Sequence, residues 1–390
     1  MRRFAIVIVV NLLVLELLSF AAVHALAWVR PDLRLDLMVH SQFSSVTESY
    51  HRTYLEKGFD RDLGWDNRPL DRRTLQATQG APWTASYDAA GAREDSTDWP
   101  RDTVATYGDS FTHCDEVENE ETWQVYLEAL LGQDVLNFGV GAYGADQAVL
   151  KFARHVAAGR VLPVTVLAIH EVDLNRAATG FRPFYNRFSG LRLTFKPSYR
   201  PVGTGVERMP NPWTDPSWSL ERLEIIAREM AETDYWVCHR LYVRPRFPHL
   251  LELLRALAFE GRQYCCRVQG IDCSGNLWDR PEGHRVMAAI VADFVATATA
   301  AGTHPVLLLI PPVNKWREGR EPPRYTAFRD TVLGTRFPTL TVVDLFDAPF
   351  DEARFNVVPF AGHASPYGNS VIARELAVAI RPLVEVTGDR

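Results

Sequence analysis

The sequence predicts an α/β protein with a three-layer αβα fold, in which helices cover both faces of a five-stranded, mostly parallel sheet. An N-terminal transmembrane helix precedes this fold. From residue 102 onward, short apolar runs alternate with amphipathic helical patterns. This alternation indicates strands joined by crossover helices, and therefore a parallel sheet covered on both faces. The runs at 164–169 and 306–310 are almost continuously apolar, as expected of strands that are buried on both sides.

The predicted elements follow in chain order. The first half of the sheet comprises strands at 102–107, 134–138 and 164–169, with helices at 122–131 and 145–158. The second half comprises strands at 305–310 and 340–344, with helices at 284–301, 322–333 and 366–382. A chain of 390 residues accommodates one large domain with an insertion, or two domains.

We divide the chain into three predicted parts: a membrane anchor at 1–30, a stalk and lead-in segment at 31–99, and the α/β domain at 100–390. Within the lead-in segment, Asp62–Pro69 contains turn-forming residues around Trp65. We expect this turn to pack against the α/β domain.

An insertion at about 176–281 interrupts the α/β domain. It begins with an aromatic loop and hairpin within 181–195 and continues with amphipathic helices at Leu220–Met230 and Leu250–Phe259. Two interpretations stay open for these helices: they cover an edge of the sheet, or they form a lid or membrane-facing cap.

The N-terminus carries a long apolar run, from Phe4 to Val29, after two arginines. A helix needs about 20 such residues to cross a bilayer. The run is interrupted by polar residues, of which Glu16 is costly inside a membrane. It is either a signal anchor, which its length favours, or a signal peptide cleaved after Ala25-Leu26-Ala27.

The leading arginines place the N-terminus in the cytoplasm under either interpretation, because positive charge is retained inside. Arginine far outnumbers lysine, which fits a GC-rich bacterial genome. We therefore expect a single-pass protein of the bacterial inner membrane, with its catalytic domain periplasmic or extracellular.

Charge and cysteine content restrict the partners. A net charge of −6 and a pI near 6.0 argue against nucleic acid. In an oxidising compartment Cys273 could pair with Cys265 or Cys266, while Cys114 is expected to be a small buried residue. The sequence shows no metal, nucleotide or cofactor signature.

The run Tyr107–Cys114, with Gly-Asp-Ser at its centre, directly follows the first predicted strand of the sheet. A strand that breaks at this tripeptide lifts the Ser110 hydroxyl and its N–H to the carboxyl edge of the sheet, where α/β proteins carry their sites. A second motif, Gly362–Asn369, opens a helix late in the chain and contains His363. A strand-end serine and a loop histidine are typical of a serine hydrolase.

With these motifs the chain resembles the SGNH/GDSL hydrolase superfamily, specifically its membrane-anchored, secreted branch. The resemblance rests on the ordered blocks Gly108–Thr112, Glu121–Trp123, Leu136–Gln147 and the His363 motif. It implies that Ser110 is the nucleophile and His363 its general base. It also implies an oxyanion hole formed by the backbone N–H groups of Ser110 and of the Gly141–Ala142 turn.

The sequence departs from the family pattern in its oxyanion donors. Val172 stands where the family usually has asparagine, and Asn175 lies near enough to substitute. The glycine expected in the second block aligns with Ala142, which keeps an N–H donor but makes a tight turn less easily.

It also departs in the orienting acid. The position three residues before His363, which usually carries the acid, is Phe360. Asp351 is our first candidate for an acid reaching the histidine, followed by Asp347 and Asp344. A Ser–His dyad oriented by a backbone carbonyl is the alternative.

Other polar residues near the serine are expected to be structural. This holds for His113 and His170, and for a solvated acidic helix start formed by Glu116, Glu118, Glu120 and Glu121.

The function expected from the resemblance is an esterase that acts on O-acyl bonds at the cell envelope, without a cofactor. Its substrate would be an acylated carbohydrate or another small ester, and its N-terminal helix would bind the inner membrane. An O-acetyltransferase that modifies an envelope polysaccharide shares the first half-reaction and stays open. So does a degenerate domain that binds carbohydrate without turnover.

Overall fold

The computed structural model of the chain describes residues 2–76, 81–97, 99, 101–186, 192–240, 242–269, 275–312, 322–358 and 361–388. The chain divides into two compact units. The first comprises Met1–Arg52, Phe181–Thr194 and Asp215–Asn276, and the second comprises Thr53–Gly180, Phe195–Thr214 and Leu277–Arg390. The first boundary falls within the segment predicted as stalk and lead-in.

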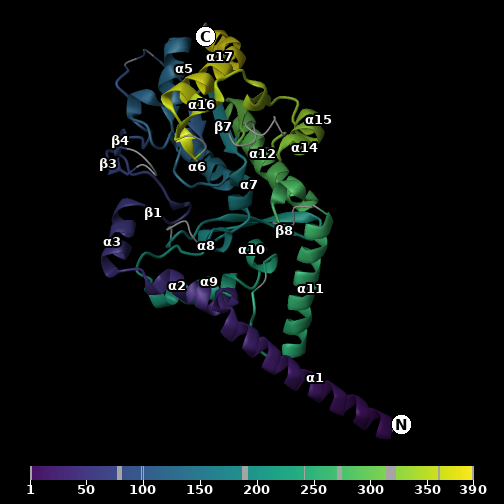
Figure 1. The fold of residues 1–390 in the computed structure, drawn as a ribbon. Coiled ribbons are helices and arrows are strands. Elements are labelled where there is room, and N and C mark those ends of the chain that lie inside the picture. The colour runs from purple at the N-terminus through teal and green to yellow at the C-terminus, as the bar shows by residue number, and fades with distance from the viewer. Residues whose placement is uncertain are drawn as a thin grey trace. The chain divides into compact units, whose positions relative to one another are not determined.

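The second unit is built on a five-stranded sheet (Figure 1). Its strands are β5 (Asp102–Tyr107), β6 (Asp134–Asn137), β7 (Val164–His170), β10 (His304–Ile310) and β11 (Thr341–Asp344). They are ordered β11-β10-β7-β5-β6, and every pairing is parallel. In chain order this is the 2-1-3-4-5 arrangement of flavodoxin-like sheets, whose order reverses between the first and third strands. The predicted fold class is confirmed.

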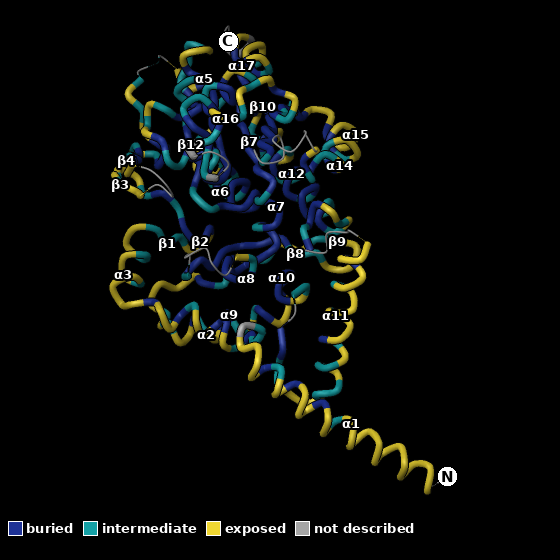
Figure 2. The backbone as a smooth tube through the Cα atoms, viewed as in Figure 1, coloured by how far each residue is buried: buried dark blue, intermediate teal, exposed yellow. Residues whose placement is uncertain are grey.

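Four long helices cover this sheet. One pair is α5 (Trp123–Leu131) with α17 (Pro366–Gly388), and the other is α6 (Ala145–Ala157) with α12 (Pro281–Ala301). Residues such as Val166 and Leu308 of the sheet are fully buried in one cluster with α5 and α17. Figure 2 shows the strands as the dark, buried centre of this unit. The almost continuously apolar strands are therefore explained by helices on both faces.

Shorter elements complete the second unit. They are β1 (Phe59–Asp60), β2 (Gly64–Trp65), β3 (Arg72–Leu75), β4 (Trp83–Ser86), α4 (Ser110–His113), α7 (Val172–Ala177), β8 (Ser198–Val202), β9 (Gly205–Met209), α14 (Thr326–Phe328), α15 (Gly334–Arg336), α16 (Glu352–Phe355), β12 (Asn356–Val358) and β13 (Ala361–Ala364). The helix predicted near 322–333 is present as one continuous helical stretch over 326–336, in which a π-helix at Arg329–Leu333 joins α14 to α15. In the segment 181–195, where a loop and hairpin were predicted, the structure describes α8, and residues 187–191 lie outside the described part. The hairpin of β8 and β9 follows this segment and was not predicted.

The turn Asp62–Pro69 packs against the sheet domain, as predicted. The indole N–H of Trp65 donates to the Gly141 carbonyl at 3.0 Å, and the Asn67 amide donates to the Gly139 carbonyl at 2.9 Å. Asp66 accepts from Lys151 of α6 at 2.7 Å. These hydrogen bonds connect the segment to the loop that follows β6 and to α6.

The first unit is helical. It contains α1 (Arg2–Val29), α2 (Leu35–Ser44), the start of α3 (Glu48–Lys57), α8 (Arg182–Tyr185), α9 (Leu220–Met230), α10 (Tyr235–Cys238) and α11 (His249–Gln269). The prediction for α9 is confirmed, and α11 extends well beyond the predicted Leu250–Phe259. Helix α2 packs on α9, and α1 packs on α11.

Two described helices are long and apolar enough to cross a membrane, α1 and α12. Helix α12 buries Val286, Ile290 and Phe294 completely, so it is a core helix of the sheet domain. Most side chains of α1 are exposed in this unit (Figure 2). The predicted N-terminal apolar helix is thus present.

One disulfide involves Cys266, whereas Cys114, Cys238 and Cys265 are free thiols. Cys265 is therefore not the bonded member of the adjacent pair. Cys273 lies outside the described residues.

Candidate active site

The nucleophile turn is held at the end of β5 by its own sequence. Asp109 caps helix α4 by accepting the Phe111 N–H at 2.9 Å, which makes Ser110 the first helical residue. A Cβ on Gly108 would lie 2.0 Å from the Thr112 hydroxyl oxygen and 2.7 Å from the Ala168 carbonyl. Only glycine fits this approach to β7. The turn therefore presents Ser110 at the carboxyl edge, beside the point where the strand order reverses.

The second motif comprises most of β13, which pairs with β12 in a hairpin, and the start of α17. Ser365 caps α17 by accepting the Gly368 N–H at 3.1 Å. A Cβ on Gly368 would lie 2.3 Å from the Phe355 carbonyl, so this position also requires glycine. The Asn369 amide donates to the Glu121 carbonyl at 2.8 Å, which ties α17 to the segment before α5. Each of these contacts helps to fix His363 on β13.

The two predicted residues meet. Nε2 of His363 lies 2.8 Å from Oγ of Ser110, across 253 positions of sequence. On the other side of the ring, Nδ1 lies 3.3 Å from Oε2 of Glu116, within ion-pair distance. The backbone N–H of His363 donates to the same carboxylate oxygen at 3.2 Å. Serine, histidine and carboxylate therefore follow one another in the order of a catalytic triad, and the 3.3 Å contact at Nδ1 is an ion-pair contact without hydrogen-bond geometry.

The charge state of His363 is set by opposing effects. Burial by itself would lower its pKa, but the adjacent Glu116 carboxylate and the negative charges of Asp115 and Asp109 raise it. The net result is a pKa above the ordinary value of 6.5. A more basic imidazole is a better acceptor for a serine proton.

The three aspartates considered from the sequence lie elsewhere. Asp351 caps α16 by accepting the Ala353 N–H at 3.1 Å, and its own N–H donates to the Tyr367 hydroxyl. Asp344 accepts from the Tyr325 hydroxyl at 2.7 Å and pairs with Arg329. Asp347 ends the 3-10 turn that follows β11. Among the described residues, the carboxylate within ion-pair distance of His363 Nδ1 is that of Glu116, whereas Asp351 contacts the Ala353 N–H.

The loop after β6 forms a turn of the type II class at Val140–Tyr143. The Tyr143 N–H donates to the Val140 carbonyl at 3.3 Å, and Ala142 has a φ of 66°. Type II turns need a positive φ at their third residue, which glycine adopts most easily. Alanine holds the conformation that the family pattern gives to glycine.

This turn also has a defined peptide orientation. The Gly141 carbonyl accepts the Trp65 indole N–H, and the Ala142 N–H belongs to the same planar peptide. The N–H and C=O of a trans peptide point in opposite directions, so the Ala142 N–H faces away from Trp65. The Val140 N–H donates to the Gly108 carbonyl at 3.1 Å, which places the turn beside the nucleophile loop.

The side chain of Asn175 forms a hydrogen bond with the backbone of the segment before α12. It is buried in α7, and its side-chain oxygen accepts the Leu277 N–H at 3.0 Å. The neighbouring Arg176 joins the loops of the site instead. Its Nη1 lies 2.8 Å from Asp109, 2.9 Å from the Tyr143 carbonyl and 3.1 Å from Asp173. One guanidinium thus links the nucleophile turn to the turn that contains Ala142.

The two other histidines near the serine have structural partners. Nδ1 of His113 lies 2.5 Å from Asp115, and its Nε2 lies 2.9 Å from the Tyr87 hydroxyl. His170 stacks on Phe111 with ring centroids 4.3 Å apart, and burial lowers its pKa to about 4. A neutral, stacked imidazole is an uncharged wall beside the site.

Sequence reasoning missed Glu116 because it was grouped with its acidic neighbours. Those neighbours separate in the structure: Glu118 and Glu121 form a capping box, whereas the Glu116 side chain is only 5% exposed. Glu116 reaches His363 from a residue with a φ of 73°. Its one available signal was position, since it follows Ser110 by six residues on the nucleophile loop.

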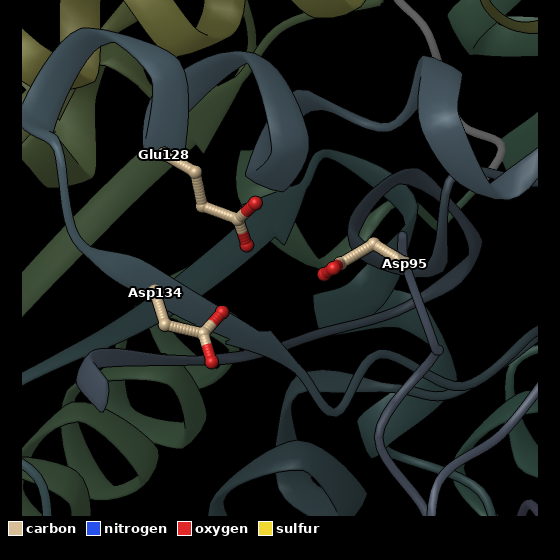
Figure 3. Close-up of side chains that lie close together, drawn as sticks. All are labelled: Asp95, Glu128 and Asp134. Atoms are coloured by element: carbon tan, nitrogen blue, oxygen red, sulfur yellow. The ribbon is translucent and has the colours of Figure 1, made fainter. Parts of the chain in front are cut away.

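A second carboxyl group cluster lies at the opposite edge of the sheet. Oxygen atoms of Asp95, Glu128 and Asp134 all lie within 4.8 Å of one another, and Figure 3 shows the three groups pointing toward a common space. Asp134 begins β6, so the cluster is at the amino edge, away from Ser110. Carboxylates of this kind can bind hard cations.

The surroundings of this cluster indicate shared protons. Glu128 is fully buried and already accepts from the Thr97 hydroxyl at 2.6 Å and from the Val135 N–H at 3.2 Å. Burial, followed by the charge of Asp95, raises the pKa of Glu128 to about 9. Burial and a hydrogen bond with Asp102 raise the pKa of Asp134 to about 6. At neutral pH the cluster therefore holds at least one proton.

Comparison with known proteins finds a similar solved structure but no similar family model or curated sequence. No protein-family model matches the chain, and no curated protein matches it. One solved structure that it resembles is described as a lipolytic protein of the G-D-S-L family from Desulfitobacterium hafniense DCB-2. The two share 12% identity with a TM-score of 0.33, over 71% of this chain and 98% of the other. The likeness is loose, and the site described above rests on this chain's own residues.

Proposed function

We propose that the chain is a serine hydrolase of the SGNH/GDSL type that acts on ester bonds. The observation that carries this proposal is the 2.8 Å contact between Ser110 Oγ and His363 Nε2. A serine hydroxyl is a weak nucleophile unless a base within hydrogen-bond reach accepts its proton. The contact joins the Gly-Asp-Ser motif to the His363 motif.

In the proposed reaction Ser110 Oγ attacks the ester carbonyl carbon while its proton passes to His363 Nε2. The tetrahedral intermediate collapses, the alcohol leaves with that proton, and an acyl group stays on Ser110. Water then attacks the acyl-enzyme with His363 again as base, releasing the carboxylic acid and restoring the serine.

The oxyanion is proposed to accept hydrogen bonds from the backbone N–H groups of Ser110 and of the Gly141–Ala142 turn. Ser110 is the first residue of α4, so its N–H has no acceptor within the helix. The Ala142 N–H is oriented by the Trp65 bond to the same peptide. Donors fixed in this way stabilise developing negative charge without reorganising.

Glu116 is proposed as the orienting acid in place of Asp351. Its carboxylate contacts both Nδ1 and the backbone N–H of His363, and burial of the side chain keeps competing water away. A carboxylate at Nδ1 holds the tautomer whose Nε2 accepts the serine proton.

The proposed substrate is an O-acyl ester, such as an acylated carbohydrate of the cell envelope, met at the outer face of the inner membrane. Helix α1 supports this location because it is long and apolar enough to anchor the chain. If a sugar hydroxyl replaces water in the second half-reaction, the same site acts as an O-acetyltransferase.

The test is turnover of p-nitrophenyl acetate and labelling by a fluorophosphonate, with the full chain in detergent. We expect turnover, and one labelled serine that is lost in Ser110→Ala. Ser370→Ala is the matched control, because its hydroxyl bonds the Tyr367 carbonyl within α17. Undiminished labelling of Ser110→Ala would exclude the proposal. Free acetate as against an acetylated acceptor sugar separates hydrolase from transferase.

A further inference from the structure

Helix α11 starts against the middle of α1. Glu16 of α1 accepts hydrogen bonds from the backbone N–H groups of His249 at 2.5 Å and Leu250 at 2.9 Å, and it lies 2.9 Å from His249 Nδ1. A carboxylate in an apolar helix is costly when unpaired, and so are the free N–H groups at a helix start. The Glu16 carboxylate accepts from the free N–H groups of α11, so both the charge and the helix start gain hydrogen-bond partners.

The position of Glu16 fixes the depth of this contact, if α1 spans the bilayer. The apolar segment Arg3–Val29 has 27 residues, and about 20 are needed for the hydrocarbon core. Every window of that length within the segment contains Glu16, at least six residues from its ends. At 1.5 Å per residue this is roughly 9 Å or more below the surface. The first turn of α11 must then lie at that depth as well.

The remaining contacts lie on the half of α1 that leads into the rest of the unit. Leu253 of α11 packs on the cluster of Val23 and Ala27, and the rings of Phe20 and His249 lie 5.0 Å apart. These α1 residues share one helical face with Glu16. Helix α11 therefore enters from the leaflet in which α1 ends at Val29.

The face of α11 that points away from α1 is apolar and uncovered. Leu251, Leu254 and Leu257 are 65, 53 and 61% exposed, and Phe247 just before the helix is 77% exposed. Figure 2 shows exposed residues recurring along this helix. An apolar stripe of this kind continues the lipid-facing surface of α1 and needs a covering of the same chemistry.

The polar residues of α11 are unevenly distributed along the helix. In the first three turns the charged residues are Glu252 and Arg255, which pair with each other at 3.9 Å, and Glu252 also lies 3.9 Å from Arg246. From Glu260 onward the helix is polar, with further charges at Arg262 and Arg267. The chemistry of α11 thus changes from apolar to polar along its length.

We propose that the first three turns of α11, His249–Phe259, insert into the lipid bilayer beside α1. The acyl chains of the leaflet would cover Leu251, Leu254 and Leu257, and the polar second half would leave the membrane. The inference rests on the proposed anchoring by α1, because the depth of Glu16 follows from it.

The test uses the full chain in vesicles of phosphatidylethanolamine and phosphatidylglycerol, with an environment-sensitive dye on single cysteines. The background is Cys238→Ser with Cys265→Ser, since Cys114 is buried and Cys266 is bonded. Cys273 lies outside the described residues, so the background alone is treated with the dye first and must take up none. The dye is placed at Leu254→Cys and Leu257→Cys on α11, and at Leu12→Cys on α1. Native Cys265, retained in a Cys238→Ser chain, is the matched position on the polar half.

Spin-labelled lipids should quench the dye at positions 254 and 257 as strongly as at 12, with protection from aqueous iodide. Cys265 should show the reverse. Lipid quenching at 12 together with iodide quenching at 254 and 257 would overturn the insertion and leave the anchor standing. Iodide quenching at all of these positions would refute the anchor itself. Protection at 254 and 257 from both quenchers would mean that protein, such as a second copy of the chain, covers the face, and would also overturn the proposal.

Discussion

At the scale of single residues, the pKa of His363 predicts the pH dependence of activity. The imidazole must be neutral to accept the Ser110 proton, and its pKa lies above 6.5 because Glu116, Asp115 and Asp109 outweigh burial. We therefore expect kcat/KM for p-nitrophenyl acetate to rise with pH through a midpoint above 6.5. The same raised pKa adds to the stability of the fold below pH 6.5. This contribution is lost as the pH rises through the pKa of His363 in the folded protein. A midpoint below 6.5 would contradict the assignment.

Replacing the proposed acid separates Glu116 from Asp351. Glu116→Gln keeps the size of the side chain but removes the charge, so the midpoint of the pH profile should fall. We expect kcat to drop by about 10²–10⁴, since replacing the triad acid of a serine protease by its amide lowers kcat by about 10⁴. Asp351→Asn is the matched control and should stay within a few-fold of the unmodified enzyme. Both are measured as kcat and kcat/KM against pH. A large loss in Asp351→Asn with little change in Glu116→Gln would restore the sequence-based choice.

The residues of the site differ in how far sequence alone could find them. Ser110 and His363 were predictable because each stands in a motif at the carboxyl edge of a strand or the start of a helix. Glu116 was not, because the chain reaches His363 through Cys114 and Glu116 at φ of 62° and 73°. Backbone conformations of this kind are rare for residues other than glycine and leave no pattern in the sequence.

At the scale of elements, the Val140–Tyr143 turn predicts a stabilising substitution. Ala142 has a φ of 66°, where a side chain costs about 1 kcal/mol or more relative to glycine. Ala142→Gly should therefore raise the free energy of unfolding by up to about 1 kcal/mol, reduced by the greater entropy of glycine in the unfolded chain. Thermal and urea unfolding measure it.

Ala148→Gly is the control for that substitution, because Ala148 is buried within α6, where glycine is about 1 kcal/mol worse than alanine. It should destabilise the chain. If Ala142→Gly destabilises by a similar amount, the positive φ at 142 is not the conformation in solution.

Elements were predictable where periodicity was long and unbroken. The five strands and α9 appear where apolar patterning placed them, since burial on one or two faces dictates that patterning. The helix predicted near 322–333 lies at 326–336, and its middle, Arg329–Leu333, is a π-helix. A π-helix closes its hydrogen bonds over one residue more than an α-helix, and a sequence period of 3.6 residues does not predict it.

At the scale of the whole molecule, α1 predicts the topology. Arg2 and Arg3 precede the apolar run that begins at Phe4, and such charges stay on the cytoplasmic side. A reporter fused after residue 390 and active only in the periplasm should therefore function in a bacterial host. Its cytoplasm-specific counterpart at the same position should be inactive. Activity of the cytoplasmic reporter alone would refute this orientation.

The stability of the whole fold should depend on pH through Glu128. Its pKa is about 9 in the folded chain, against an ordinary value of 4.5, because burial and Asp95 disfavour its charge. A raised folded pKa gives stability that is complete below pH 4.5 and is lost as the pH rises toward 9. The native chain should thus become less stable across this window.

Glu128→Gln cannot ionise and keeps an acceptor for the Val135 N–H. Its stability relative to the native chain should rise between pH 5 and pH 9, by an amount on the order of a few kcal/mol at pH 8, since each pKa unit is worth about 1.4 kcal/mol. Glu120→Gln, at an exposed position outside the cluster, should show a difference that stays flat with pH. Urea unfolding at a series of pH values measures both. A Glu128→Gln difference that is equally flat would mean that Glu128 is ionised in the fold, and the protons assigned to the cluster would have to be replaced by a bound cation.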